Sequence, residues 1–262
     1  MALIVEACGA THIGDREEQQ DRVAIYPHPR ARGALLAALA DGMGGHTGGA
    51  LAAEQVLHAA RLGFDHARPG AGNVADMLRD AINDAHDAIQ LTRYTSEQDP
   101  HSTACLLVLQ AGRADWAHCG DSRLYHFRDG RPMTRTADHS YVGDLMRHGF
   151  LTEAQAEAHP NRNILTSCLG DQAPPCIEFG ATAPLVAGDC FVLCSDGIWA
   201  WFSDEELGRT VRDFPPRRAA EAMIDAARGR AKGRGDNCAL AILRLVEEVR
   251  DPTAARRPVR SA

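Results

Sequence analysis

The chain has 262 residues, of which 45% are hydrophobic and 24% charged, so it can bury a substantial core as one large domain or two small ones. This composition excludes wholesale disorder. The formal net charge of −7 excludes the basic surface that a general nucleic-acid-binding protein needs.

Eight short segments have the apolar, β-branched composition of strands, and several of them are bounded by Gly or Asp. They span residues 3–8, 22–26, 34–40, 103–110, 114–119, 123–128, 190–194 and 238–245. Helical periodicity of about 3.6 residues appears at 48–64 and 74–91, between the third and fourth strands. Shorter helices are predicted at 141–148, 152–158, 203–213 and 217–228, and Ser203 and Glu206 predict a capping box at the start of the third of these.

Strands and helices do not alternate strictly along this chain, so a doubly wound parallel sheet is not expected. The order favours mostly antiparallel sheets that pack together and are covered by helices. We find no internal repeat and no linker that divides the chain. Residues 1–249 are therefore predicted to form one domain, and the arginine- and proline-rich residues 250–262 a disordered basic tail.

The sequence also predicts a cytoplasmic location. No segment approaches the roughly 18–20 apolar residues that cross a bilayer, and the first residues lack the basic and apolar regions of a signal peptide. None of the eight cysteines forms a CxxC pair, and several lie in strand-like segments. We interpret them as small buried hydrophobic residues in a reducing compartment.

Five aspartates stand at strand ends or in tight turns that contain glycine: Asp21, Asp41, Asp121, Asp196 and Asp236. Any one of them is explained as an ordinary Asp-Gly turn. Five together, at strand ends that can converge, indicate a site for hard divalent cations such as Mg²⁺ or Mn²⁺, which prefer carboxylate and carbonyl oxygens.

Arg16 lies five positions before the first of these aspartates. Its guanidinium fork matches two phosphate oxygens, which lysine cannot do as a point charge. The alternative is a surface arginine paired with Glu17 or Glu18, and this segment alone does not decide between the two.

The segments resemble, in this order, the metal-dependent serine/threonine protein phosphatases (the protein phosphatase 2C or PPM family), in particular small bacterial members. The resemblance extends from Gly14 to Leu245. It is carried by Gly14-x-Arg16-x-x-Gln19-Gln20-Asp21, Ala40-Asp41-Gly42-Met43-Gly44-Gly45-His46, Ser102-Thr103-Ala104, Gly120-Asp121-Ser122-Arg123, Asp138-His139-Ser140, Leu165-Thr166 with Leu169-Gly170, Cys194-Ser195-Asp196-Gly197-Ile198-Trp199, and Asp236-Asn237.

The resemblance implies an α+β fold of four layers (αββα), in which two antiparallel sheets are flanked by helix pairs and a flap at about residues 141–162 lies beside the active site. It implies that Asp41 bridges two metal ions and that the Gly42 carbonyl binds one of them. Asp196 and Asp236 would complete the other metal site. Asp21 would act at the first site through water, and Asp121 with Asp196 would form a looser third site.

The resemblance also implies that Arg16 binds the substrate phosphate and that Asn237 and Gln20 support the site without binding a metal ion directly. Gln19 and Gln20 replace the Asn and Glu usual in the family, which weakens a water-mediated metal contact there. Met43 occupies the position of a histidine found in animal members. His46 lies nearby and is the candidate proton donor, with a helix-capping role as the alternative.

The function implied is hydrolysis of phosphoserine and phosphothreonine by a water activated between two Mn²⁺ or Mg²⁺ ions, with a third ion weakly bound. The expected partners are phosphorylated proteins, including a serine/threonine kinase that the enzyme opposes in bacterial signalling, and the expected state is a monomer. Two alternatives come from other classes. One is an inactive phosphatase-fold binding module, and the other is a hydrolase of small phosphoesters on a different fold.

Overall fold

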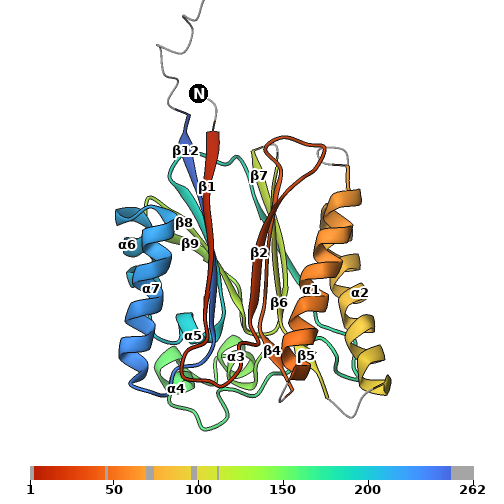
Figure 1. Cartoon of the computed structure of the whole chain (residues 1–262). Coiled ribbons are helices and arrows are strands. Elements are labelled where there is room, and N and C mark those ends of the chain that lie inside the picture. The colour runs from red at the N-terminus through yellow and green to blue at the C-terminus, as the bar shows by residue number, and fades with distance from the viewer. Residues whose placement is uncertain (1–2, 45–46, 69–73, 96–98, 111, 249–262) are drawn as a thin grey trace, which may run out of the picture.

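Two antiparallel sheets pack face to face between two groups of helices in the computed structural model, which describes residues 3–44, 47–68, 74–95, 99–110 and 112–248 (Figure 1). The first sheet has the strand order β1 (Leu3–His12), β12 (Cys238–Glu247), β11 (Asp189–Cys194), β8 (Arg123–Arg128) and β9 (Arg131–Arg135). The second has the order β10 (Glu178–Thr182), β7 (Arg113–Cys119), β6 (Ala104–Gln110), β3 (Leu35–Ala40) and β2 (Arg22–Pro27). A small ladder pairs β4 (Gly42–Met43) with β5 (His101–Ser102).

Helices α1 (Thr47–His66) and α2 (Val74–Thr95) cover the outer face of the second sheet, and α6 (Asp204–Asp213) and α7 (Pro216–Ala231) cover that of the first (Figure 1). The short α5 (Asp196–Trp199) follows β11 directly. Helices α3 (Tyr141–Arg147) and α4 (Glu153–Glu157) lie in the connection between β9 and β10, near one end of the sandwich (Figure 1). The four-layer α+β fold expected from the sequence is confirmed.

Strand β3 shows why a continuous apolar run suits this position. Its residues Ala37 and Leu39 pack between the sheets, whereas Leu36, Ala38 and Ala40 pack under α1 and α2. Successive side chains of a strand point to opposite faces. Both faces of β3 are covered, so every side chain from Leu36 to Ala40 is buried and the run needs no polar alternation.

All eight predicted strands are present, and the six predicted helices form with small shifts of their ends. The capping box is confirmed, because Ser203 accepts from the backbone of Glu206 while Glu206 accepts from the backbone of Ser203. The sequence patterns did not predict strands β4, β5, β9 and β10 or helix α5. Strand β9 lies at the edge of its sheet, where it pairs with β8 alone, and four of its five residues are exposed. It therefore lacks the apolar pattern that identifies a buried strand.

No disulfide joins the eight cysteines, five of which are buried, while Cys8 and Cys168 are half-buried and Cys176 is exposed. Among the helices in the described ranges, none combines the length and apolar character needed to cross a membrane. The predicted tail at 250–262 lies outside the described residues, so the domain boundary near residue 249 stays a prediction.

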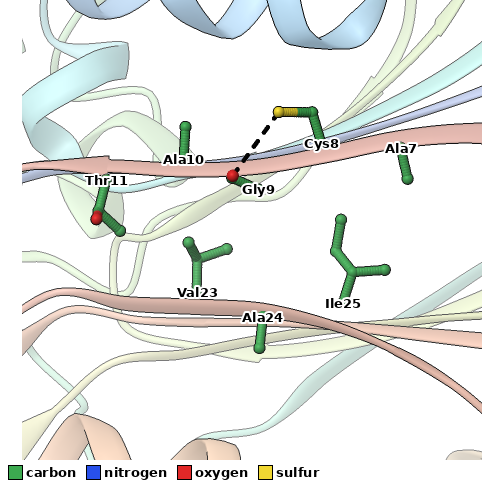
Figure 2. Close-up of a pocket in the computed structure, with 8 residues that line it drawn as sticks. All are labelled: Ala7, Cys8, Gly9, Ala10, Thr11, Val23, Ala24 and Ile25. Carbon is green, nitrogen blue, oxygen red and sulfur yellow. Dashed lines mark hydrogen bonds between the residues drawn. The ribbon is translucent and has the colours of Figure 1, made fainter.

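The two edge strands β1 and β2 form an apolar groove with a volume of about 460 Å³. Figure 2 shows Ala7 and Thr11 pointing toward β2, and Val23 and Ile25 pointing toward β1. Gly9 lies between Ala7 and Thr11 on the same face and contributes no side chain there. The groove therefore has room for a small side chain at position 9.

We expect Gly9→Ala to stabilise the protein by about 0.5–1 kcal/mol, because alanine restricts the unfolded chain more than glycine does. A Cβ at this position would lie 3.8 Å and 4.0 Å from the two methyl carbons of Val23, which is ordinary contact. Urea denaturation of both proteins measures the difference. Gly197→Ala is the opposite control, because its Cβ would meet the Asn237 carbonyl oxygen at 1.9 Å and it should destabilise. A destabilised Gly9→Ala protein would contradict the expectation.

Candidate metal centre

The antiparallel pairing of the strands brings the predicted aspartates to one end of the sandwich. In such a pair, the end of one strand lies beside the start of its neighbour. Arg22 at the start of β2 is paired with Ala40 at the end of β3, so Asp21 and Asp41 lie next to each other. In the other sheet, Cys194 at the end of β11 is paired with Leu240 near the start of β12, which brings the segments that carry Asp196 and Asp236 together.

Electrostatic coupling shows that all five carboxylates share one environment. Burial raises the pKa of Asp41 well above its ordinary value, and further increases come from the charges of Asp21, Asp196, Asp121 and Asp236. Burial is likewise the main cause that raises the pKa of Asp21 to about 7, of Asp121 to about 8 and of Asp196 to about 6. The carboxylates repel one another in a poorly solvated site, as the clustering of five aspartates predicts.

Asp41 is held by hydroxyl and backbone groups of the β5–β6 connection. Its backbone N–H donates to Thr103 Oγ1 at 2.9 Å, and its carbonyl accepts from Thr103 N at 2.9 Å and from Ser102 Oγ at 3.1 Å. Thr103 Oγ1 also bonds Ser122 Oγ at 2.7 Å. Because Ser122 follows Asp121, the same threonine connects the turns that carry two of the five aspartates.

Gly42 permits a very close approach of helix α1 to the turn after Asp41. A Cβ on Gly42 would lie 2.0 Å from the carbonyl oxygen of Gly49 in α1, so no other residue fits there without a backbone shift. Gln20 lies at the same contact, since its Oε1 would be 2.8 Å from a Cβ on Gly49. The glycines thus allow the backbone of β4, helix α1 and the Gln20 segment to meet beside Asp41.

Asp21 is buried and is fixed by Ser195, which lies 174 positions away in sequence. Ser195 Oγ donates to Asp21 Oδ2 at 2.7 Å and accepts from Ala239 N at 3.0 Å. This hydrogen bond favours the charged carboxylate and opposes the effect of burial on the Asp21 pKa. Ser195 thereby ties β2 of one sheet to β11 and β12 of the other.

Asn237 organises the segment that carries Arg16. Its Nδ2 donates to the carbonyls of Ile13 and Glu18 at 2.8 Å and 2.9 Å, and its Oδ1 accepts from Gln20 N at 2.7 Å. Three bonds from one buried side chain hold both ends of the loop between β1 and β2. This placement suits the supporting role expected for Asn237.

Arg16 lies over this acidic end and pairs with Asp236. The distance from its Nη2 to Asp236 Oδ2 is 2.5 Å, and the Arg16 side chain is 60% exposed. Within the described part of the chain, Arg16 makes no ion pair with Glu17 or Glu18. The alternative that pairs it with one of these glutamates is therefore wrong, and its partner is Asp236. The exposed guanidinium therefore lies beside the acidic cluster.

The structure thus brings together Arg16, Asp21, Asp41, Gly42, Asp121, Asp196, Asp236, Asn237 and Gln20. His46, the candidate proton donor, lies outside the described residues. The sequence reading gave no role to Ser102, Thr103 or Ser195. All three belong to the motifs that carry the resemblance, and Ser195 directly precedes Asp196, but their hydroxyl contacts cross between strands and leave no local signal.

The chemistry of the donors fits hard divalent cations. Five carboxylates and the carbonyl of Gly42 offer only oxygen, and no cysteine or histidine belongs to the set. Burial raises the pKa values of Asp21, Asp121 and Asp196, and the charges of neighbouring aspartates raise them further, so bound cations would relieve that repulsion. The arrangement can therefore hold divalent cations beside an exposed arginine.

Comparisons with known proteins agree with this arrangement. A sequence model described as protein phosphatase 2C matches residues 8–231. The protein phosphatase PhpP of Streptococcus pneumoniae is 31% identical over 242 residues, which cover 91% of this chain and 96% of PhpP.

Solved structures show the same fold. The serine/threonine phosphatase of S. agalactiae superposes with a TM-score of 0.85 at 27% identity, covering 93% of this chain and 100% of that protein. The catalytic domain of the serine/threonine protein phosphatase PstP, solved in complex with two manganese ions, superposes with a TM-score of 0.76 at 28% identity and covers 94% and 100% of the two chains.

Proposed function

The chain belongs to the protein phosphatase 2C family and is a metal-dependent serine/threonine protein phosphatase, and we propose that its five clustered aspartates form the active centre. The observation that supports this proposal most directly is that burial, reinforced by the charges of neighbouring aspartates, raises the pKa values of Asp41, Asp21, Asp121 and Asp196. Carboxylates with strongly perturbed pKa values cluster at functional sites.

The proposed ligands of two Mn²⁺ or Mg²⁺ ions are Asp41, the Gly42 carbonyl, Asp196 and Asp236, with Asp21 acting through water. Asp41 suits the bridging position because the charges of all four other aspartates act on it. Asp121 is proposed to hold a third ion with Asp196, whose charge is the largest electrostatic contribution to the Asp121 pKa.

Arg16 is proposed to bind the phosphate of the substrate. Its guanidinium already contacts a carboxylate oxygen of Asp236, and a phosphate oxygen offers the same kind of acceptor. A phosphate that approaches the ions would therefore meet Arg16 beside the acidic cluster. Asn237 and Gln20 are proposed to keep the Arg16 loop in place through the Gln20 N to Asn237 Oδ1 bond.

When bound, the two cations supply a lowered pKa for water and neutralise charge on the phosphoryl group. The protein keeps the ligating carboxylates in fixed positions, with Ser195 holding Asp21 and Thr103 holding the backbone of Asp41. Phosphoryl transfer needs mainly positioning and charge neutralisation from the protein. His46 is proposed as the proton donor to the leaving oxygen, with helix capping as its alternative role.

The finer features of the function are also proposals. We expect a cytoplasmic monomer that acts on phosphorylated proteins, including a serine/threonine kinase that it opposes. The expected cytoplasmic location rests on the eight cysteines, none of which forms a disulfide. Mn²⁺ and Mg²⁺ both suit the oxygen donors, so activity with each is expected.

Chelation tests the proposed function. We expect hydrolysis of a phosphothreonine peptide to stop in excess EDTA and to return when Mn²⁺ or Mg²⁺ is restored, because the carboxylates alone activate no water. Phosphate release is the measurement, and the same peptide carrying phosphotyrosine is the control substrate. Undiminished hydrolysis in excess EDTA would exclude the metal centre as the active centre.

A further inference from the structure

A second cluster of ionisable side chains lies at the root of the flap, outside the five aspartates. It consists of His118 on β7, His139 just before α3, and Glu178 on β10, whose ligand-type atoms lie within 4.8 Å of one another. His118 and Glu178 are direct partners in the β7–β10 ladder. The two histidines are 2% and 3% exposed.

His139 is bonded on two sides to the turn that carries Asp121. Its backbone N–H donates to the Gly120 carbonyl at 3.0 Å, and its Nδ1 accepts from Gly120 N at 3.2 Å. An accepting Nδ1 places the proton of the neutral ring on Nε2. Nε2 lies 3.4 Å from Glu178 Oε1 but out of line for a well-formed hydrogen bond.

Glu178 also contacts the flap helix. Nη2 of Arg147, the last residue of α3, lies 3.2 Å from the same Oε1 atom. Ser140, which follows His139, caps the start of α3 by accepting from Gly143 N at 3.1 Å. Both ends of α3 are therefore connected to this cluster. The start of α3 is connected through the His139–Ser140 segment, and its end through Arg147.

The charged groups around the histidines come from several elements. Burial lowers the pKa of both rings, whereas the Glu178 carboxylate on β10 raises both. The Arg147 charge on α3 lowers the pKa of His139, and the Asp138 charge before α3 raises that of His118. His118 Nε2 donates to the Ala137 carbonyl at 2.8 Å, and His118 Nδ1 has no hydrogen-bond partner among the described residues. Both rings are accordingly neutral at pH 7.

A transition-metal site is the other use of two histidines and a carboxylate, but the geometry opposes it. The rings are stacked, with centroids 4.7 Å apart and planes inclined by 16°. A metal ion lies close to the plane of each imidazole that binds it, and two nearly parallel, stacked rings cannot both meet that requirement without turning. Ligation through His139 Nε2 would also move its proton to Nδ1, against the Gly120 N–H.

We propose that Glu178 is a positioning residue that holds the flap in register with the Asp121 turn, acting through His139 and Arg147. The connection runs from Asp121 through Gly120 to His139, then through Glu178 to the last turn of α3. Among the described residues, the ion pairs of Glu178 are with His139 and Arg147 and not with a proposed metal ligand. The proposal rests on the proposed function, because it concerns how a phosphoprotein is seated beside that centre.

The test compares Glu178→Gln with Asp144→Asn, which removes the other carboxylate near Arg147, 4.0 Å away, and leaves the histidines unchanged. We expect Glu178→Gln to raise the KM for a phosphothreonine peptide about 3- to 10-fold, as loss of one or two polar contacts would, with kcat nearly constant. Hydrolysis of p-nitrophenyl phosphate, which is too small to need the flap, should change less than about twofold. Asp144→Asn should resemble the wild type on both substrates.

An equal loss on both substrates, or an unchanged KM for the peptide, would overturn the positioning role. A measurement that does not depend on catalysis distinguishes failure of the positioning role from failure of the proposed function. Long-range ¹H–¹⁵N spectra of the Mg²⁺-loaded protein should show the Nε2–H tautomer of His139 and a lower His139 pKa in Glu178→Gln. An unchanged His139 pKa would overturn the contact between His139 and Glu178. Shifts of ring nitrogens of both His118 and His139 on addition of Zn²⁺ would show a metal site in place of that contact.

Discussion

Replacing Asp41 by asparagine is expected to reduce kcat for a phosphothreonine peptide on the order of a thousandfold. Asp41 experiences the charges of all four other aspartates, as a carboxylate shared by two cations would. Asparagine keeps the shape but removes the charge that two cations would share. Steady-state kinetics at saturating Mn²⁺ measure the loss of kcat, and calorimetric titration with Mn²⁺ measures the loss of metal affinity.

Two variants control this experiment. Asp84→Asn changes an exposed aspartate on α2 and should leave kinetics and Mn²⁺ binding unchanged. Arg16→Ala should raise the KM for the peptide while Mn²⁺ binding persists, because Arg16 offers no metal-binding atom. Wild-type activity in Asp41→Asn would contradict the bridging role. Loss of Mn²⁺ binding in Arg16→Ala would contradict the assignment of Arg16 to phosphate.

The metal-free protein is expected to become less stable as the pH rises from about 5.5 to 8.5. The folded pKa values of Asp196, Asp21 and Asp121 are raised to about 6, 7 and 8 from 3.8, so between these pH values the folded state binds more protons than the unfolded state. The stabilising contribution of these carboxyls is therefore greatest below the unfolded value of 3.8, declines as the pH rises toward each folded pKa, and levels off above it. Melting in EDTA across this range measures the trend.

Two effects oppose this decline. Burial lowers the pKa values of His86, His118 and His139, which adds stability as the pH rises from 5.5 to about 6.5, so the decline is clearest above pH 6.5.

The second effect acts below the lower limit of the range. Hydrogen bonds from Arg128, Val186 and His126 outweigh burial and lower the pKa of Asp189. Asp189 therefore contributes stability above its unfolded pKa, which is lost only under more acidic conditions. A metal-free melting temperature that rises steadily from pH 5.5 to 8.5 would contradict the shared acidic site.

Added Mn²⁺ should reverse the loss at high pH. Binding to the folded state alone contributes about 2.7 kcal/mol at a hundredfold excess over the dissociation constant, and it should release protons near pH 7. Asp41→Asn should melt above the wild type in EDTA at pH 8.5, since one repelling charge is gone, yet gain less from Mn²⁺. Indifference of the wild-type melting temperature to Mn²⁺ would exclude a metal site in the cleft.

Much of the fold is determined by local sequence patterns. The run of β3 and the periodicity of α1 and α2 predict buried elements because burial on one or two faces imposes its period on neighbouring residues. The capping box of α6 is equally local, since Ser203 and Glu206 are three residues apart. The aspartates at strand ends could be selected in the same way, because a strand end and a glycine turn are visible in the sequence.

The contacts that make a site from these residues were decided only by the tertiary structure. Ser195 reaches Asp21 across 174 positions, and Arg16 reaches Asp236 across 220. His139 and Glu178 meet because β10 pairs with β7, and the sequence of β10 has no pattern that predicts a strand. Such pairs depend on strand order and register, and these follow from the packing of whole layers. Local periodicity reports whether a residue is buried, and it contains no information about which distant residue is buried beside it.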